Sequence, residues 1–355
     1  MKKNIIGLAG LVIVIAGIIL YRFLSSGPST QVTLKGYVGG EKAGFLQNDK
    51  VLSILSRRYG VTLNWSKAGS MEMVRDSVQK SDFLWPSSEV ALAYYKMQHG
   101  NLVKSENIFN SPIVLYSWDI VTDALIRENI VTVRDSIYFI TDLPRLIGLA
   151  VGGKKWADIG LSQLYGRVSI ISTDPNKSNS GAMFAGLLAN VLCGDVADSS
   201  TIGRVLPTIR SYFSTLGYME HSSGDLFQQY LSTGIGAKPI IVGYESQIIE
   251  FSIQNAAQWP SIKHKVRILY PEPTVWSAHP LILQSPGSDA LRAALLDPDV
   301  QKIAWEQHGF RTGMMGAQND PKLLAVVGIP AVVNKVIPLP GPAVMDRILT
   351  TIAGE

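Results

Sequence analysis

Small polar residues recur in this sequence at points where a strand is expected to end and a helix to begin. Four such loops contain Gly39-Gly40-Glu41-Lys42, Gly69-Ser70, Ser87-Ser88 and Ser178-Asn179-Ser180-Gly181. Their hydroxyl, amide and backbone N–H groups, aided by the positive end of a helix dipole, can hold an oxyanion or another polar group without a full counter-charge. The same residue types also cap helices, so each single loop has a purely structural explanation as well.

The candidate ligand residues are the hydrogen-bond donors and the charged residues of these loops, together with two residues at the end of one later strand. Lys42 would add a positive charge, whereas Glu41 would repel an anion and so favours either an outward orientation or a ligand with a cationic group. Tyr244 and Glu245 end a strand that is expected to face a cleft. The full predicted ligand set is Gly40, Glu41, Lys42, Ser70, Ser87, Ser88, Ser178, Asn179, Ser180, Gly181, Tyr244 and Glu245.

The elements that must position these residues alternate between short strands and helices. Alternating or continuous apolar runs predict the strands, and apolar residues at helical spacing predict the helices between them. Strand, small polar loop and helix in repetition indicate an α/β fold with a parallel sheet. The strands are expected at 31–38, 61–65, 81–86, 112–118, 168–172 and 238–245, and the helices at 45–59, 71–78, 87–97, 121–128, 182–192, 298–305 and 343–352.

Catalysis and metal binding have little support in the sequence. Cys193 is the single cysteine and the five histidines are scattered, so neither a disulfide nor a metal site is expected, and no cofactor is predicted. Ser180 lacks the preceding glycine of the Gly-x-Ser-x-Gly nucleophile elbow. The chain is therefore expected not to be an enzyme, with a serine hydrolase that uses Ser180 kept as an alternative.

The amino terminus indicates the compartment. Residues 5–21 are almost entirely apolar and would span roughly 26 Å as a helix, which is close to the thickness of a bilayer core. Lys2 and Lys3 precede this run and place the amino end in the cytoplasm. Residues 1–30 are thus predicted to be a signal anchor, that is, a transmembrane helix followed by a linker. A cleaved secretory signal remains the alternative.

Charge and composition limit the classes of partner. Hydrophobic residues make up 46% of the chain and charged residues only 17%, which favours a folded protein with a large core. The net charge is +4, but Lys2, Lys3 and Arg22 stand in a segment without acidic residues. Without these three, 29 of the 32 basic residues remain against 28 acidic ones. A body of such balanced charge argues against nucleic-acid binding.

The order of these loops and strands resembles the type II periplasmic solute-binding proteins, the group that includes molybdate, sulfate and phosphate binders. The resemblance covers about residues 31–350 and includes 39–42, 68–70, 111–115, 174–181, 242–246 and 298–311. It implies two α/β lobes, joined by two crossover strands, that close on a solute. The implied lobes are 31–117 plus 250–320 and 118–249, with a tail at 321–355 that packs on a lobe.

The resemblance also implies a function and a location. It suggests a solute-binding protein that captures a small polar or anionic solute and presents it to a membrane transporter, as in ABC transport. Similar anchored proteins suggest a von Willebrand factor A-type partner instead of a transporter. The body would lie in the periplasm or outside the cell, either attached to the bacterial cytoplasmic membrane by a single span or secreted if the signal is cleaved. A non-catalytic envelope interaction module with a vestigial cleft is the main alternative.

Overall fold

The computed structural model describes residues 31–75, 80–100, 102–314 and 319–354. The predicted signal anchor and linker at 1–30 lie outside these residues, so the anchor stays a prediction. Within the described part of the chain, no helix is both long and apolar enough to cross a membrane.

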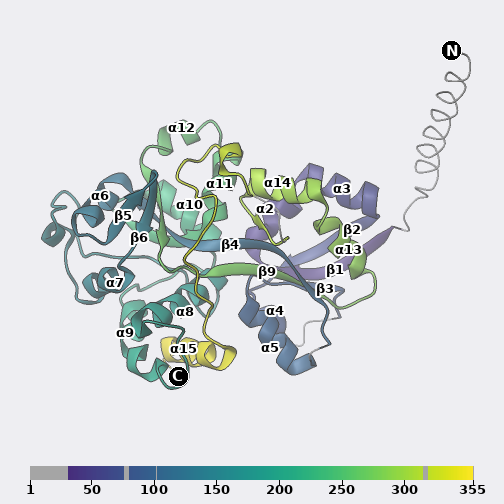
Figure 1. Cartoon of the computed structure of the whole chain (residues 1–355), viewed down its shortest axis with the longest axis horizontal. Coiled ribbons are helices and arrows are strands. Elements are labelled where there is room, and N and C mark those ends of the chain that lie inside the picture. Colours follow the sequence, from purple (N-terminus) through teal and green to yellow (C-terminus); the bar gives the residue numbers. More distant parts are fainter. Residues whose placement is uncertain (1–30, 76–79, 101, 315–318, 355) are drawn as a thin grey trace, which may run out of the picture.

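One mixed sheet of ten strands runs through the molecule (Figure 1). Its order is β2-β1-β3-β9-β4-β8-β6-β5, while β7 and β10 pair with β4 beside this path. The strands are β1 (Val32–Val38), β2 (Val61–Lys67), β3 (Phe83–Trp85), β4 (Ser105–Trp118), β5 (Val131–Arg134), β6 (Ile137–Ile140), β7 (Ile240–Tyr244), β8 (Val266–Pro271), β9 (Trp276–Leu283) and β10 (Arg311–Thr312).

Strand β4 connects two halves of this sheet. Its residues 105–112 pair with β9, whereas residues 113–118 pair with β7 and β8. The parallel pairs β1–β2, β1–β3 and β6–β8 are combined with antiparallel pairs elsewhere. The sheet is therefore mixed, not parallel throughout as the strand–helix repetition suggests.

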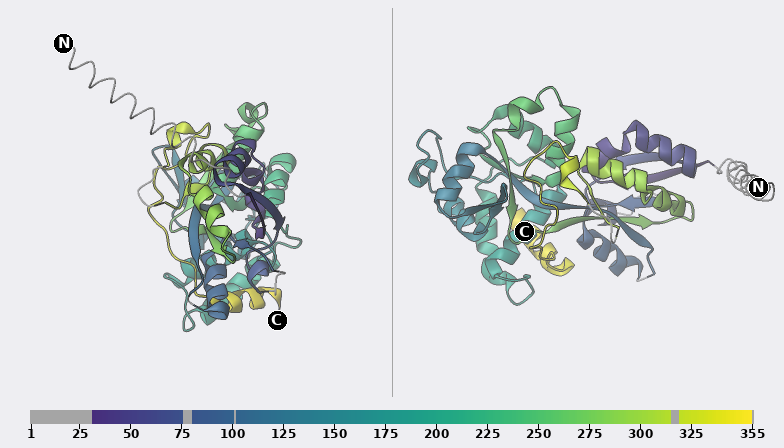
Figure 2. Two further views of the ribbon diagram at one scale, coloured as in Figure 1. Left: turned by 90° about the vertical axis from the view of Figure 1, so that its right-hand side faces the viewer. Right: turned by 45° about the horizontal axis from the view of Figure 1, so that its top comes forward.

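Helices cover both halves of the sheet and complete two lobes (Figures 1 and 2). In the first lobe they are α2 (Ala43–Leu46), α3 (Asp49–Tyr59), α4 (Glu72–Arg75), α5 (Glu89–His99), α13 (Ser288–Leu295) and α14 (Pro298–His308). In the second lobe they are α6 (Asp119–Arg127), α7 (Leu143–Val151), α8 (Asn179–Cys193), α9 (Ile202–Ser214), α10 (Ser223–Thr233), α11 (Glu245–Gln254) and α12 (Trp259–Ile262).

Separate hydrophobic cores support the description as two lobes. One core gathers buried residues of β1, β2, β3, α2, α3, α13 and α14, and a second gathers those of α6, α7, α8 and α9. A further core lies under α10, α11 and β8. The predicted boundaries of the lobes remain a proposal. Strand β8 falls in the range 250–320 predicted for the first lobe, yet it pairs with β4 and β6 in the second half of the sheet.

The carboxyl-terminal tail runs from the first lobe to the second. The Trp305 indole donates to the carbonyl of Asp320 (3.0 Å), and Asn190 of α8 donates to the carbonyl of Pro338 (2.8 Å). The tail ends in α15 (Pro342–Ala353), close to the expected helix at 343–352. This helix packs against α8 and α9 and also contacts α5.

Most of the predicted elements appear in the structure, and one strand does not. The segment 168–172 forms no ladder, because it pairs with β7 through a single bridge between Ile171 and Ile241. The helix predicted at 45–59 is divided into α2 and α3, with Asn48 capping α3 through the N–H of Lys50. Gly60 ends α3 as expected, in the left-handed conformation at φ 64°.

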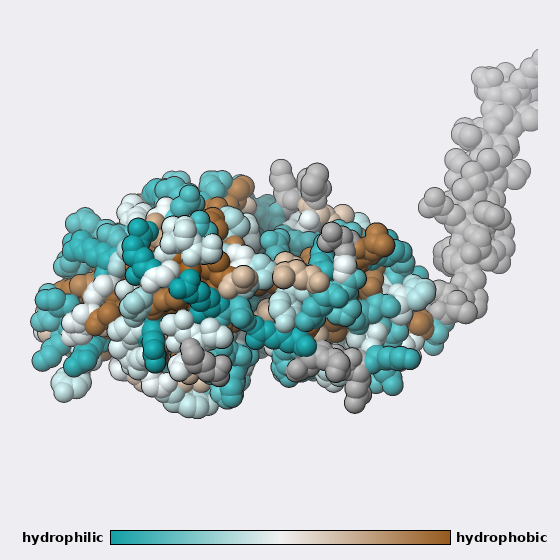
Figure 3. Space-filling view, turned by 90° about the horizontal axis from the view of Figure 1, so that it is seen from below, coloured by the Kyte–Doolittle hydropathy of each residue, from teal (hydrophilic) through white to brown (hydrophobic). Residues whose placement is uncertain are grey.

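Seen from below, the surface is mostly hydrophilic (Figure 3). Apolar side chains on this face gather mainly towards the middle of the left-hand lobe and form no continuous belt. The described body therefore presents water-compatible side chains over most of this face.

Candidate functional site

A cavity of about 370 Å³ lies between the two lobes, where β1 and β2 end and α8 and α10 begin. Its size falls within the range of about 300–1,000 Å³ that is usual for small-molecule sites. The lining residues come from both lobes: Gly39, Gly40, Glu41, Lys67, Ala68, Gly69, Ser70 and Glu72 on one side, and Lys177, Ser178, Asn179, His221, Ser222, Ser223, Asp225 and Tyr244 on the other.

Six predicted ligand residues line this cavity. They are Gly40, Glu41, Ser70, Ser178, Asn179 and Tyr244. Five others are buried and are not among the lining residues: Lys42, Ser87, Ser88, Ser180 and Gly181. Loops that are far apart in the sequence thus meet at one place, and contact with a ligand remains a prediction for each of these residues.

The twelfth predicted ligand residue, Glu245, has a different environment. Both oxygens of its buried carboxylate are engaged by the guanidinium of Arg311, at 2.7 and 2.9 Å, and Tyr270 donates a further hydrogen bond at 2.6 Å. Arg311 also donates to the backbone carbonyls of Pro330 and Ala331. Glu245 therefore holds the tail and β10 to α11, and it is not among the residues that line the cavity.

Glu41 and Lys42 form an ion pair at the floor of the cavity. The Lys42 ammonium lies 2.6 Å from Oε1 of Glu41 and 2.5 Å from Oγ of Ser87. It also lies over the ring of Trp85, 5.4 Å from the centroid. The Lys42 side chain is fully buried, whereas the Glu41 side chain is 11% exposed. The positive charge is thus hidden behind the carboxylate, and only the carboxylate reaches the cavity.

The pKa values of this group keep the carboxylate charged. Burial raises the pKa of Glu41, but the charge of Lys42 and hydrogen bonds from Lys42 and Ser87 outweigh it, and the pKa falls to about 2. Burial lowers the pKa of Lys42, and Glu41 opposes that shift only in part. Burial, followed by the nearby Lys42 charge, lowers the pKa of His279 well below its ordinary value, so this imidazole is neutral at pH 7.

Gly39 allows the Glu41 carboxylate to fold back over the chain. A Cβ atom at Gly39 would lie 2.4 Å from Oε1 of Glu41 and 2.6 Å from Oγ of Ser87. The backbone at Gly39 is extended, with φ −62° and ψ 141°, a conformation open to any residue. The glycine is therefore needed for space beside the ion pair and not for its backbone conformation.

Three of the predicted serines have structural roles in the first lobe. The hydroxyl of Ser70 accepts the N–H of Ser87 at 2.9 Å, and Ser87 in turn donates to Glu41. Ser88 caps α5 by accepting the N–H of Ala91. Capping therefore explains Ser88, while Ser70 and Ser87 position the loop that supports Glu41.

The amino terminus of α8 differs from that of α5. Ser178 is its N-cap residue, but its hydroxyl makes no capping hydrogen bond. Instead it lies 3.1 Å from Oγ of Ser180, which lies 2.8 Å from Oγ1 of Thr173. The first-turn N–H groups of a helix need partners from outside the helix. At α8 this end borders the cavity, because Lys177, Ser178 and Asn179 line it.

Asn179 connects the two lobes beside the cavity. Its amide donates to the carbonyl of Ser87 in the first lobe at 2.8 Å, and to the hydroxyl of Tyr244 at 3.0 Å. Gly181 lies deeper, where a Cβ atom would come within 2.4 Å of the carbonyl of Thr173. Gly181 thus lets α8 pack closely on the preceding loop, and Asn179 closes the lobes on one another.

Several lining residues were not predicted from the sequence. Lys177 directly precedes the Ser178 loop, and Lys67 is the last residue of β2. The segment 221–225 carries a helix-start signal, since Ser222 caps α10 and Asp225 stands in its first turn. No predicted strand precedes that helix, so the strand–loop–helix pattern used to find the other loops does not reveal it.

The alternatives with catalytic or metal chemistry gain no support from this geometry. The Ser180 hydroxyl is buried, with Thr173 and Ser178 as its nearest hydroxyl partners. In the part of the chain that the structure describes, no group of three or more His, Cys, Asp or Glu residues is arranged to hold a metal ion.

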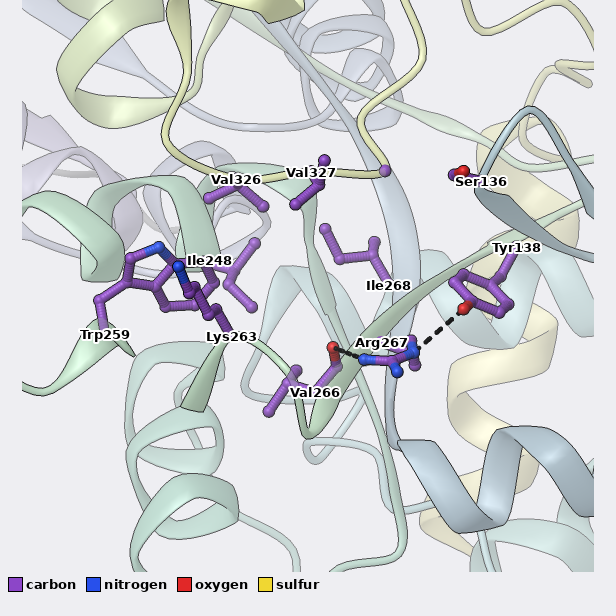
Figure 4. Close-up of a pocket in the computed structure, with 11 residues that line it drawn as sticks. Ser136, Tyr138, Ile248, Trp259, Lys263, Val266, Arg267, Ile268, Val326 and Val327 are labelled. Carbon is purple, nitrogen blue, oxygen red and sulfur yellow. Dashed lines mark hydrogen bonds between the residues drawn. The ribbon is translucent and has the colours of Figure 1, made fainter. Parts of the chain in front are cut away.

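A second, smaller cavity of about 170 Å³ lies away from the cleft, between α11, α12, β8 and the tail (Figure 4). Arg267 on its wall donates to the hydroxyl of Tyr138 and to the backbone of Val266 and His264. No predicted ligand residue lines it. These contacts are local to the second lobe, so this cavity does not join the two lobes.

Comparison with solved structures identifies the fold. The sulfate-binding protein SubI from Mycobacterium tuberculosis is 15% identical, with a TM-score of 0.52 over 89% of this chain and 96% of that chain. A putative extracellular solute-binding protein from Bordetella parapertussis is 11% identical, with a TM-score of 0.58 over 91% and 97%. Iron-bound HitA from Pseudomonas aeruginosa is 13% identical, with a TM-score of 0.56 over 91% and 99%.

Sequence comparison adds no closer relative. No protein-family model matches the chain, and no curated protein matches it. The structural likeness extends over nearly the full length of each neighbour, so the chain has the fold of the type II periplasmic solute-binding proteins.

Proposed function

We propose that this chain is an extracytoplasmic solute-binding protein that captures a small polar solute in the cleft between its lobes. The observation that carries the proposal is the cavity of about 370 Å³ lined by loops of both lobes. Ligands in open α/β sheets bind beyond the carboxyl ends of strands, which is where this cavity lies. The neighbours are binding proteins for sulfate, iron and other solutes, in keeping with this role.

Closure of the lobes is the expected response to the solute. The hydrogen bond from Asn179 to Ser87 crosses the cleft, as does the ion pair between Arg75 of α4 and Asp346 of α15. A ligand that touches both lobes binds the closed state better than the open state and shifts the population toward it. A transporter or another membrane partner would then recognise the closed form.

Native mass spectrometry of the full-length protein with an extract of polar small molecules tests the proposal. We expect one solute to remain bound at a stoichiometry of one, and to raise the midpoint of thermal unfolding. At a hundredfold excess over its dissociation constant a ligand stabilises a protein by about 2.7 kcal/mol. If no solute binds, an envelope interaction module with a vestigial cleft becomes the better description. No observation favours a serine hydrolase.

The anchor and the membrane partner form a separate part of the proposal. The apolar run at 5–21 would keep the body at the outer face of the cytoplasmic membrane, beside an ABC-type transporter or a von Willebrand factor A-type partner. Membrane fractionation of the full-length chain and of a variant without residues 1–30 tests it. The full-length chain should sediment with membranes and the variant should not. A variant that still sediments would contradict a single anchor.

A further inference from the structure

The charge of the cleft restricts the solute that it can hold. Among the described residues that line the cavity, three are acidic and two are lysines: Glu41, Glu72 and Asp225 against Lys67 and Lys177. A dianion such as sulfate would therefore meet a wall with no excess of positive side chains. The helix dipole of α8 supplies only partial charge, equivalent to about half an elementary charge.

The buried Lys42 does not correct this balance. Its ammonium is already bound by Glu41 and Ser87 and is fully buried behind them. An anion in the cavity would meet the Glu41 carboxylate before the ammonium. The order of these two charges, with the acid toward the cavity and the base behind it, is unfavourable for an anion at this point and favourable for a cation.

Glu41 also has a free acceptor. Lys42 and Ser87 both bind its Oε1 atom, and Oε2 has no hydrogen-bond partner among the described residues. Because the Glu41 side chain lines the cavity and is 11% exposed, this oxygen can accept a hydrogen bond from a ligand or a water molecule there. An ammonium group in the cavity would donate to Oε2 and neutralise the carboxylate more completely than Lys42 does alone.

The first turn of α8, on the second-lobe side of the cavity, suits a negative group. Ser178 leaves the first turn of α8 without a side-chain cap, and this first turn contains no acidic residue. The neighbouring α10 differs, because Ser222 caps it and Asp225 stands in its first turn. Lys177 adds a positive charge beside α8. Backbone N–H groups, a hydroxyl and a lysine are the usual partners of a carboxylate, sulfonate or phosphate.

We infer that the solute is zwitterionic, with a cationic group that faces Glu41 and an anionic group that faces the first turn of α8. This inference rests on the proposed function, since it assigns a ligand class to the same cleft. It separates the chain from a binder of simple oxyanions, which the helix-end serines alone would favour.

Matched probes test the inference on the full-length protein. Taurine, β-alanine and phosphoethanolamine carry an ammonium group, and ethanesulfonate, propionate and ethyl phosphate are the same molecules without it. Isothermal titration calorimetry should show at least one zwitterion that binds tenfold or more tightly than its partner. Sulfate and molybdate serve as simple oxyanions and should bind more weakly than that zwitterion.

A charge-neutral double variant, Glu41→Gln/Lys42→Met, completes the experiment. It removes both charges together and so avoids a buried ammonium without a partner, which could prevent folding. We expect it to lose the preference for the ammonium-bearing probe while circular dichroism shows a retained fold. The matched control is Glu245→Gln/Arg311→Met, which alters the other buried ion pair and should keep the preference.

Several outcomes would overturn the inference. Tighter binding of sulfate or molybdate than of every zwitterion would refute the ligand class and leave solute capture intact. A preference that survives in Glu41→Gln/Lys42→Met would remove Glu41 from the site. Failure of all probes at 10-millimolar concentration, roughly the limit of weak binding by affinity arithmetic, would refute the ligand class. That result alone would leave the proposed function standing. The proposed function would also fail if native mass spectrometry found no bound solute.

Discussion

Two buried ion pairs in this protein look similar in isolation and differ in what their carboxylates face. Glu245 uses both oxygens within the protein, on Arg311 and Tyr270. Glu41 uses one oxygen, on Lys42 and Ser87, and its side chain reaches the cavity. A fully satisfied pair holds elements together, whereas a half-satisfied pair at a cavity is able to receive a ligand. Sequence position alone could not separate them, because both acids closely follow a strand: Glu41 comes three residues after β1, and Glu245 directly after β7.

The largest expected effect is a loss of stability at the satisfied pair. Glu245→Gln leaves the Arg311 guanidinium buried without a counter-charge, and such a change costs about 3–5 kcal/mol. Urea unfolding of the full-length protein should show this decrease in the free energy of unfolding, with solute affinity unchanged in the folded protein. A loss below 1 kcal/mol, together with weaker solute binding, would place Glu245 in the binding site.

A pH series distinguishes the contribution of Glu41. Its pKa in the folded protein is about 2, below the ordinary value of 4.5, so the ionised carboxylate stabilises the fold above pH 4.5. This stabilisation is lost as the pH falls from about 4.5 towards 2. The difference in unfolding free energy between the wild type and Glu41→Gln/Lys42→Met, which leaves no buried ammonium without a partner, should therefore shrink over that window. A difference that stays constant from pH 7 to pH 3 would show that the charge of Glu41 does not stabilise the fold.

Asn179→Ala should weaken the contact between the lobes. It removes the hydrogen bond to Ser87 and the one to Tyr244, and each such bond contributes about 1 kcal/mol. We expect a fall of roughly tenfold in solute affinity, and a more open molecule by small-angle X-ray scattering. The matched control is Asn176→Ala in the same loop, which does not line the cavity. Equal effects in both variants would indicate damage to the loop and not to closure.

The smallest change that still tests the comparison is Gly39→Ala. The added methyl group would displace the Glu41 carboxylate and the Ser87 hydroxyl, which are ends of side chains and can move. Stability should fall by less than about 1 kcal/mol, because the backbone at Gly39 accepts alanine without strain. The preference for an ammonium-bearing probe should decrease. An unchanged preference would show that the position of the Glu41 carboxylate does not matter for binding.

Much of the fold follows from local patterns in the sequence. The alternation of β1, α3 and β2 and the stop at Gly60 depend on neighbouring residues, and the structure confirms them. The segment 168–172 has the composition of a strand, but pairing is a long-range property and only Ile171 meets a partner. For the same reason the direction of each strand in the mixed sheet could not be predicted from composition.

The sequence predicts which loops form the site, but it does not predict what each side chain in those loops does. The loops at 39–42, 69–70 and 178–181 do border one cavity. Ser88 caps its helix, whereas Ser178 makes no capping hydrogen bond. This difference is set by side-chain rotamers, which the sequence does not reveal. The orientation of the Glu41–Lys42 pair likewise depends on Ser87, which lies 45 residues away from Lys42.

The most direct test of solute capture in the cleft compares three proteins in one native mass spectrometry experiment. The wild type, Glu41→Gln/Lys42→Met and Glu245→Gln/Arg311→Met are each incubated with the same extract of polar small molecules. We predict one bound solute on the wild type and on the second double variant, and a clearly lower occupancy of the first. Equal occupancy of all three proteins, or no solute on the wild type, would contradict the account.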